Sequence, residues 1–328
     1  MNQPPQEFVS TPAEALHSFV SAAAQAVGLP EARAELLASL LSGNDLRGVF
    51  SHGTQQIATY ARLMRDGRLN NAPDIEVVRE TPCSVLVDGD GGLGYFPAHE
   101  ATSRVIGKAA DAGIAIAMTR NHGHFGAAGL YSRMTLEHDL ITYVTSGHQL
   151  HLKPGDSLFS AAGGSPMSFS APAAEEDALV VDFGAMHDLY SSSPHRERLA
   201  ELAPGLVLRS IGMGEICQSW GGLMSGMPLD ADPPRWTFPG ANQGSMIITF
   251  RIDLFIEPAD FKREMDEYAR RIRELEPLPG LDQAFMAGGA EAARERQYRE
   301  EGVPVGPDHR RVLEDLADEL GIDTPWSS

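Results

Sequence analysis

The sequence predicts an α/β protein in which a mixed central sheet is joined by a discontinuous helical layer from the N- and C-terminal segments. Two observations lead to this fold class. Hydrophobic residues recur at helical spacing at both ends of the chain, and short Val- and Leu-rich strands alternate with helices between them. We therefore expect residues 1–72 plus 256–328 to form a helical domain, and residues 73–255 to form a central α/β domain with the functional cleft.

The N-terminal segment predicts three helices. Thr11-Pro12-Ala13-Glu14 has the form of a capping box with proline at the first helical position, and the apolar spacing that follows it continues to Gly28. A leucine stripe predicts a second helix from Pro30 to Gly43, and a third covers residues 54–65. Residues 71–73 are the best candidate for a linker.

Beyond Pro73 the pattern changes to alternating strands and helices. The predicted strands are 75–78, 84–88, 114–119, 140–145, 178–182 and 245–252, and the predicted helices among them are 97–112 and 126–138. The glycine-rich stretch between residues 182 and 245 is expected to be rich in loops. Helices over 258–275, 283–300 and 308–320 complete the chain.

Charge and composition exclude several classes of protein. Lys and Arg total 26 against 45 Asp and Glu, so the formal charge is 26 − 45 = −19 and nucleic acid is an unsuitable partner. No window is apolar for long enough to span a bilayer, and the first residues lack the pattern of a signal peptide, which predicts a cytoplasmic protein without a membrane partner. Cys83 and Cys217 lack a CxxC spacing, so we assign them no redox role.

One glycine-rich motif, Gly89-Asp90-Gly91-Gly92-Leu93-Gly94, matches G-x-G-x-x-G after a predicted strand, with Asp111 downstream. Two carboxylates, Asp88 and Asp90, would lie beside a pyrophosphate, and the next helix is predicted to begin only at residue 97. A plain turn is favoured over a Rossmann site. The same run fails as an EF-hand, because His99 stands at the position of the ligating glutamate.

Histidines supply the candidate chemistry. His122 and His124 lie in a loop between a strand and a helix, where a catalytic or ligand-binding histidine is favoured over a metal site or an ordinary loop residue. In Ser51-His52-Gly53, the histidine suits proton transfer near neutral pH, although a capping serine beside a solvent-exposed histidine explains the same residues. His148 and His151 remain ambiguous.

These residues resemble the type-2 malate/L-lactate dehydrogenase family in type, order and spacing. The matching segments are Asp45-Leu46-Arg47-Gly48, Ser51-His52-Gly53 with Tyr60, residues 87–94, residues 124–129 with Tyr131, Gly163–Pro166, Val181-Asp182, Asn242–Gly244, Pro279-Gly280 and Glu301–Val303. The resemblance implies an NAD(P)-dependent oxidoreductase of non-Rossmann fold that works as a homodimer on a small 2-oxo, 2-hydroxy or cyclic imino acid.

The resemblance also implies roles for individual residues. His52 would give or take the substrate's proton, with Ser51 as its neighbour and His124 as a second polar group in the active site. The implied substrate-binding residues are Arg47, Gln56, Tyr60, Arg120 and His148, and the implied cofactor-binding residues are His124, Gly126, Gly164, Ser165, Pro166, Asp182 and Arg209. No metal is implied.

Several positions depart from the family pattern. Gln56 replaces an arginine that would meet a substrate carboxylate, two hydroxyl-bearing positions near residues 163–166 and 182–186 are lost, and a lysine-glycine motif survives as Arg209-Ser210. The stretch from residue 182 to 226 is also shorter. These departures leave open whether NAD, NADP or neither is bound. The alternatives are a cofactor-free isomerase, lyase or cyclase that uses the histidines for proton transfer, and a non-catalytic binding protein.

Overall fold

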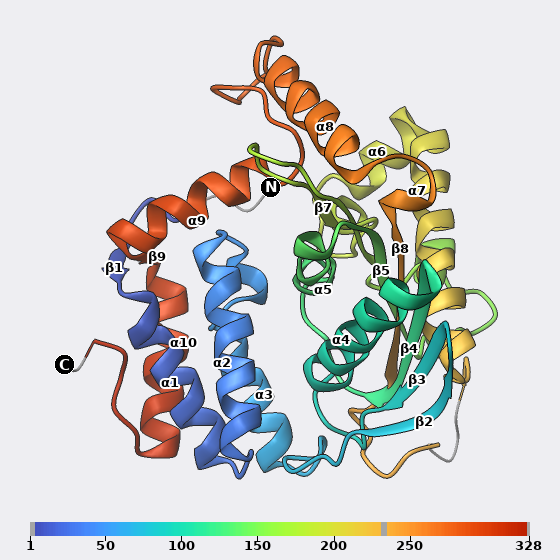
Figure 1. The fold of residues 1–328 in the computed structure, drawn as a ribbon. Coiled ribbons are helices and arrows are strands. Elements are labelled where there is room, and N and C mark those ends of the chain that lie inside the picture. The colour runs from blue at the N-terminus through green and yellow to red at the C-terminus, as the bar shows by residue number, and fades with distance from the viewer. Residues whose placement is uncertain (1–3, 231–234, 327–328) are drawn as a thin grey trace. The chain divides into compact units, whose positions relative to one another are not determined.

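A computed structural model describes residues 4–230 and 235–326 and divides the chain into two compact units (Figure 1). The helical unit contains Met1–Pro73 and Gly288–Ser328, and the sheet unit contains Asp74–Ala287. None of the helices in the described part of the chain combines the length and the apolar character that crossing a membrane requires.

The helical unit is built from both ends of the chain. Its helices are α1 (Ala13–Ala26), α2 (Glu31–Leu46), α3 (Gln56–Arg65), α9 (Gly289–Glu301) and α10 (Pro307–Leu320). α1 packs against α2, α3 and α10, and buries its stripe of Leu16, Phe19 and Val20. A short antiparallel pair of β1 (Val9–Thr11) and β9 (Val303–Val305) also ties the two ends together. The predicted helical layer shared by the two termini is confirmed.

The capping box predicted at the first helix is wrong. Thr11 is the last residue of β1, where it pairs with Val303, and its hydroxyl contacts the carbonyl of Val9. Pro12 is therefore the N-cap of α1, without a side-chain capping bond. The strand pairing draws Thr11 into extended backbone and away from the helix. Neither β1 nor β9 was expected from the sequence, because three-residue strands carry almost no periodic signal.

The sheet unit contains seven strands in the order β2-β3-β4-β8-β5-β6-β7. They are β2 (Glu76–Thr81), β3 (Ser84–Asp88), β4 (Ile114–His122), β5 (Leu140–His148), β6 (Pro166–Ala171), β7 (Leu179–Gly184) and β8 (Gln243–Arg251). Only the β3/β4 pair in this sheet is parallel, and the other neighbours run antiparallel. The predicted mixed central sheet is confirmed.

Helices cover the two faces of the sheet differently. α4 (Tyr95–Ala112) packs on one face over β3, β4 and β8, where the small residues Ala115 and Ala117 admit it closely (Figure 1). α5 (Gly129–Met134) packs against β5, β6 and β7. On the other face, a π-helical turn, Cys217–Gly222, presses on β5 and β8. Gly147 allows this contact, because a Cβ there would lie 2.5 Å from the backbone nitrogen of Gly222.

The expectation of a loop-rich stretch between residues 182 and 245 is wrong for residues 196–225, and residues 231–234 of this stretch lie outside the described residues. It contains α6 (Arg196–Leu202), α7 (Pro204–Ile216) and the π-helical turn. Glycine lowers helix propensity, but in α7 Gly214 serves packing, since a Cβ there would lie 2.4 Å from the Cβ of Ala162. Strand β6 was also missed, because its sequence Pro166–Ala171 is rich in serine.

The helix α8 (Pro258–Arg273) groups with the sheet unit, whereas the sequence placed residues 256–328 with the terminal helices. Its buried Asp266 accepts hydrogen bonds from the backbone N–H groups of residues 174–176. Lys262 also pairs with Asp139 at 2.8 Å. These contacts attach α8 to loops of the sheet unit.

Candidate active site

The Ser51-His52 pair lies in a short 3-10 turn, Phe50–His52, between α2 and α3. The hydroxyl of Ser51 lies 3.0 Å from Nδ1 of His52. Ser51 is exposed and His52 is half-buried. Burial lowers the pKa of His52 below its ordinary value of 6.5, so the imidazole is neutral at pH 7. A neutral imidazole beside a hydroxyl is suited to accept a proton.

A buried polar network lies directly beneath this turn. Oδ2 of Asp45 accepts hydrogen bonds from the backbone N–H of Thr54 at 3.1 Å and from its hydroxyl at 2.5 Å. The same hydroxyl lies 3.0 Å from Nε2 of His309, on α10. Desolvation raises the pKa of Asp45 to about 7 and lowers that of His309 to about 4. Sequence reasoning missed Thr54 and His309, since a threonine and a histidine far apart in the chain give no local signal.

Three predicted substrate-binding residues belong to the helical unit. Gln56, the first residue of α3, donates its amide to the carbonyl of Ser51 at 2.7 Å, so it braces the histidine turn. Tyr60 is buried one helical turn further along α3. Arg47 pairs with Glu295 at 2.9 Å and also donates to the carbonyl of Gly43. The guanidinium of Arg47 is therefore already engaged in an ion pair.

In the sheet unit, the loop after β4 carries His124, and the glycine-rich turn of residues 89–94 supports this loop. The backbone N–H groups of Gly94 and Gly123 donate to the carbonyls of His124 and Gly92, respectively. A Cβ at Gly94 would lie 2.5 Å from Nδ1 of His122. The glycines of the motif are thus explained by close packing of two loops. The expected helix start at residue 97 is wrong, because α4 begins at Tyr95 with Gly94 as its N-cap.

His122, next to this loop, is fully buried and bonded at both ring nitrogens. Nδ1 lies 2.7 Å from the carbonyl of Gly123, and Nε2 lies 2.7 Å from the hydroxyl of Thr119. Burial lowers its pKa to about 4, so it remains neutral over the physiological range. His122 therefore holds the loop in shape, and His124, two residues further along, is half-buried.

Two further predicted residues also belong to this loop region. Gly126 has φ of +82°, and a Cβ there would lie 2.5 Å from the ring of Tyr95, so only glycine fits. Arg120 pairs with Asp88 at 2.8 Å. The same carboxylate accepts from the side chain of Asn121. Arg120 is thus held by a carboxylate at the end of the neighbouring strand β3.

The turn of residues 163–166 precedes β6. Gly163 and Ser165 have φ of +60° and +52°, respectively, and the hydroxyl of Ser165 donates to the carbonyl of Ala162. Ser165 is fully buried, so its hydroxyl stabilises the turn. At Gly164, an added Cβ would meet no atom within 4 Å among the described residues. The Cβ position of Gly164 is therefore open, whereas its carbonyl accepts from the hydroxyl of Tyr190 at 2.9 Å, and Pro166 begins the strand.

A buried glutamine that the sequence did not suggest joins this turn to His148. Oε1 of Gln218 accepts from the backbone N–H of His148 at 3.0 Å, and its Nε2 donates to the carbonyl of Ala162. A Cβ at Gly163 would lie 2.3 Å from that amide and 2.7 Å from the His148 ring. Burial lowers the pKa of His148. The structure thus brings His148 and the 163–166 turn together.

Asp182 and Arg209 lie on different elements of the sheet unit. Asp182 is exposed on β7 opposite Ser168, and a Cβ at Gly129 would lie 2.5 Å from its carboxylate. Arg209 is exposed on α7, the helix whose Gly214 packs on the 162–165 turn. Asp182 therefore lies on the strand paired with β6, and Arg209 lies on the helix that packs beside the 162–165 turn.

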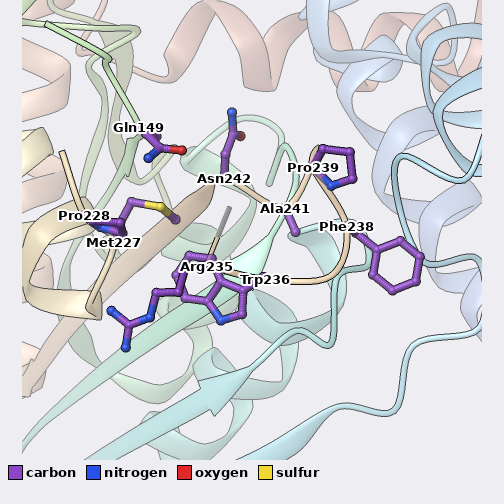
Figure 2. A pocket seen from close by; sticks show the side chains of 9 residues that line it. All are labelled: Gln149, Met227, Pro228, Arg235, Trp236, Phe238, Pro239, Ala241 and Asn242. Carbon is purple, nitrogen blue, oxygen red and sulfur yellow. The ribbon is translucent and has the colours of Figure 1, made fainter. Parts of the chain in front are cut away.

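A pocket of the sheet unit lies next to His148, since Gln149 is one of its lining residues (Figure 2). Amides, aromatic rings and a guanidinium form its lining, which consists of Gln149, Met227, Pro228, Arg235, Trp236, Phe238, Pro239, Ala241 and Asn242. The guanidinium of Arg235 lies 5.2 Å from the Trp236 ring and donates to the carbonyl of Gly226. Phe238 packs on Gly91, which joins the pocket to the glycine-rich turn.

The described residues contain no group of three or more His, Cys, Asp or Glu side chains that could hold a metal ion. The predicted site residues form separate groups, each of which lies within one unit. Ser51, His52, Gln56 and Tyr60 lie together in the helical unit. In the sheet unit, His148 and residues 163–166 form one set, and His124 with Gly126 forms another.

Comparisons with known proteins give a consistent result. Residues 11–186 match the family model described as malate/L-lactate dehydrogenase. The chain is 26% identical to malate dehydrogenase of Pyrococcus horikoshii over 95% of this chain and 94% of that protein. It is 22% identical to ureidoglycolate dehydrogenase (NAD(+)) of Escherichia coli K12, over 92% and 93%, respectively.

Solved structures show the same fold. The structure of P. horikoshii malate dehydrogenase superposes with a TM-score of 0.83 at 23% identity, covering 99% of each chain. That of Δ1-piperideine-2-carboxylate reductase from Pseudomonas syringae has a TM-score of 0.68 at 18% identity, over 94% of this chain and 100% of that one. Because the family model spans more than half of the sequence and includes both the His52 turn and the His124 loop, the chain belongs to the malate/L-lactate dehydrogenase family.

Proposed function

We propose that this protein is an NAD(P)-dependent oxidoreductase of a small 2-oxo, 2-hydroxy or cyclic imino acid, with His52 as the proton donor and acceptor. Family membership supports an enzyme of the dehydrogenase type. The observation that carries the proposal is the His52 turn itself, in which a half-buried imidazole of lowered pKa contacts the Ser51 hydroxyl at 3.0 Å.

His52 would exchange the proton through Nε2, because Nδ1 contacts Ser51. In the direction of oxidation, the neutral imidazole takes the proton of the substrate hydroxyl. In the direction of reduction, the imidazolium returns it to the carbonyl oxygen or to the imine nitrogen. Ser51 keeps the ring in one orientation, and Gln56 holds the backbone of Ser51.

The sheet unit offers groups that fit a dinucleotide. A Cβ at Gly164 would face open space, Asp182 carries a carboxylate that can accept from ribose hydroxyls, and Arg209 carries a guanidinium that can pair with phosphate. We assign these three residues, with His124 and Gly126, to holding the cofactor. When bound, the nicotinamide supplies or accepts the hydride.

The substrate is expected to differ from that of relatives named malate dehydrogenase. Gln56 is neutral, and both Arg47 and Arg120 are already engaged in ion pairs. A second carboxylate on the substrate would therefore lack a charged partner in these positions. A 2-oxo or cyclic imino acid with a single carboxylate suits this arrangement better than malate.

We further propose a homodimer. The sheet face opposite α4 carries the exposed residues Ile114 and Ile116, and the adjoining turns carry Trp220, Leu223 and Met224. Their exposed fractions run from 36% to 60%, and β4 packs beside the turn that carries Leu223 and Met224. Such a cluster of large apolar side chains is typical of a surface that a second copy covers.

A panel assay tests the proposed function. The purified protein is mixed with NADH or NADPH and with a series of 2-oxo acids and cyclic imino acids, and oxidation of the cofactor is followed by absorbance. Turnover with at least one acid is expected, and Arg209→Ala should weaken cofactor affinity by about tenfold, the value of one charge-assisted hydrogen bond. Arg263→Ala, on the exposed face of α8, is the matched control. Turnover of an acid without any nicotinamide would favour a cofactor-free isomerase, lyase or cyclase.

A further inference from the structure

We propose that Asp45, Thr54 and His309 form a buried positioning chain that fixes the Ser51-His52-Gly53 turn and thereby the orientation of the His52 imidazole. This inference rests on the proposed role of His52 in proton transfer. The three residues come from α2, from the turn before α3 and from α10, so three parts of the helical unit meet in this set of residues.

Hydrogen bonds and packing contacts place this positioning chain directly against the Ser51-His52-Gly53 turn. Thr54 follows Gly53, and Asp45 binds both its backbone N–H and its hydroxyl. The carboxylate also fills the space beside Gly53, since a Cβ there would lie 1.6 Å from Oδ1 of Asp45. One residue earlier in α2, the amide of Asn44 donates to the carbonyl of His52 at 2.9 Å. The last residues of α2 thus hold the backbone on both sides of Gly53.

The proton positions in the chain follow from the donor count. A hydroxyl has one proton, and in this geometry Thr54 donates it to Oδ2 of Asp45. His309 must then donate from Nε2 to the oxygen of Thr54, at 3.0 Å. Burial keeps His309 neutral, so it is the Nε2–H tautomer. The two hydrogen bonds of the positioning chain therefore point the same way, because His309 donates to Thr54 and Thr54 donates to Asp45.

The arrangement is costly if it serves stability alone. Asp45 and Thr54 are fully buried, and Oδ1 of Asp45 has no hydrogen-bond partner among the described residues. Arg47, two residues away, forms its ion pair with Glu295. An apolar cluster of equal volume would be more stable than a buried carboxylate without a cation. A polar chain that holds a reactive turn in one geometry explains why these residues are present.

The test compares Thr54→Val, which keeps the shape and removes the hydroxyl, with Thr54→Ser, which keeps the hydroxyl. Ser42→Ala is the matched control, because its hydroxyl is also buried in α2 but bonds within that helix, to Ala38. For each variant, circular dichroism establishes folding, steady-state kinetics give kcat and KM, and NMR follows the titration of the His52 imidazole, which is assigned by comparison with His52→Ala.

We expect Thr54→Val to lower kcat by about tenfold or more with KM changed by less than about threefold, because orientation of the imidazole acts on the reaction step. Its His52 pKa should rise toward 6.5, since a loosened turn rehydrates a ring whose pKa is lowered by burial. Thr54→Ser and Ser42→Ala should resemble the wild type. A folded Thr54→Val protein with wild-type kcat and an unchanged His52 titration would overturn the proposal.

Two features keep the test decisive. If Thr54→Val does not fold, the ¹⁵N spectrum of the wild type still reports the His309 tautomer, and a proton on Nδ1 in place of Nε2 would overturn the proposed chain. If the wild type turns over no acid, the proposed function fails, whereas the His52 titration in the variants continues to decide whether the chain positions that ring.

Discussion

At the residue scale, His52 carries the reaction in this account. His52→Ala removes the group that exchanges the proton, so kcat should fall by about a hundredfold or more while the fold survives. Because its pKa lies below 6.5, kcat/KM for oxidation should be constant above that pH and fall below it, where the imidazole becomes protonated and ceases to be a base. A variant with wild-type turnover would exclude this role.

We expect Gln56 to determine which acids are accepted. Its amide now donates to the carbonyl of Ser51 and offers no charge. Gln56→Arg should raise kcat/KM for malate by about tenfold or more, because a guanidinium supplies a bidentate partner for the second carboxylate. Gln55→Arg, at the neighbouring position, is the control. The comparison is made with malate oxidation at fixed cofactor, and an unchanged rate would show that Gln56 does not face the substrate.

Asp45 makes stability depend on pH. Its pKa is about 7 in the folded protein against 3.8 for the unfolded reference, so the folded state disfavours the charged form. The resulting penalty is absent below pH 3.8, grows as pH rises and is complete above pH 7. An asparagine at position 45 does not titrate and therefore does not pay this penalty. The free energy of unfolding of Asp45→Asn, relative to that of the wild type, should rise by a value on the order of 2 kcal/mol between about pH 5 and pH 8. Urea unfolding at the two pH values measures this difference, and an equal difference at both would contradict the raised pKa.

The sequence identified His52, Ser51 and His124 as candidates because short motifs mark them. It could not show that Arg47 and Arg120 are engaged in ion pairs, because Glu295 is remote in the chain and Asp88 belongs to another strand. Gln218 and His309 were missed for the same reason: each acts through a contact that only the folded chain creates.

At the scale of elements, two glycines test the packing of the glycine-rich turn. Gly94 is the N-cap of α4, and Gly107 lies within the helix. A Cβ at Gly94 would lie 2.5 to 2.7 Å from three atoms of the 122–125 loop, whereas one at Gly107 would meet nothing within 4 Å. Gly94→Ala should therefore destabilise the protein by about 2 kcal/mol or more. Gly107→Ala should stabilise it by about 0.5–1 kcal/mol, since alanine favours the helix. Thermal unfolding of the two variants gives both signs, and a Gly94→Ala variant as stable as wild type would refute the close packing.

Elements with strong periodicity were predicted closely, such as α1 and the central strands β4 and β8, whose apolar residues alternate or repeat clearly. The sequence underestimated α7, since its glycines at 205, 212 and 214 suggested loops. Only the contact of Gly214 with Ala162 shows that glycine there serves helix packing. Local propensity could not reveal such a tertiary reason.

At the scale of the whole molecule, the exposed apolar surface on the sheet predicts association. Ile116→Asp places a charge within that surface and should convert the dimer to a monomer, because burying an unpaired carboxylate opposes contact with a second copy. Leu278→Asp, at a residue with 73% exposure, should leave the mass unchanged. Light scattering measures the mass of each protein, and a monomeric wild type at micromolar concentration would contradict the proposed homodimer.

The central claim is that a nicotinamide cofactor binds to this chain. The hydroxyl of Ser165 donates to the carbonyl of Ala162 within its own turn, so fewer groups contact the dinucleotide. A site that lacks two or three charge-assisted hydrogen bonds has a lower affinity than a micromolar site. We therefore expect a dissociation constant between about 0.1 and 1 mM. Titration of the purified protein with NADH and NADPH, followed by nicotinamide fluorescence, tests this most directly. Saturable binding of at least one of them in the submillimolar range is expected. The absence of saturable binding for both up to about 10 mM would contradict it.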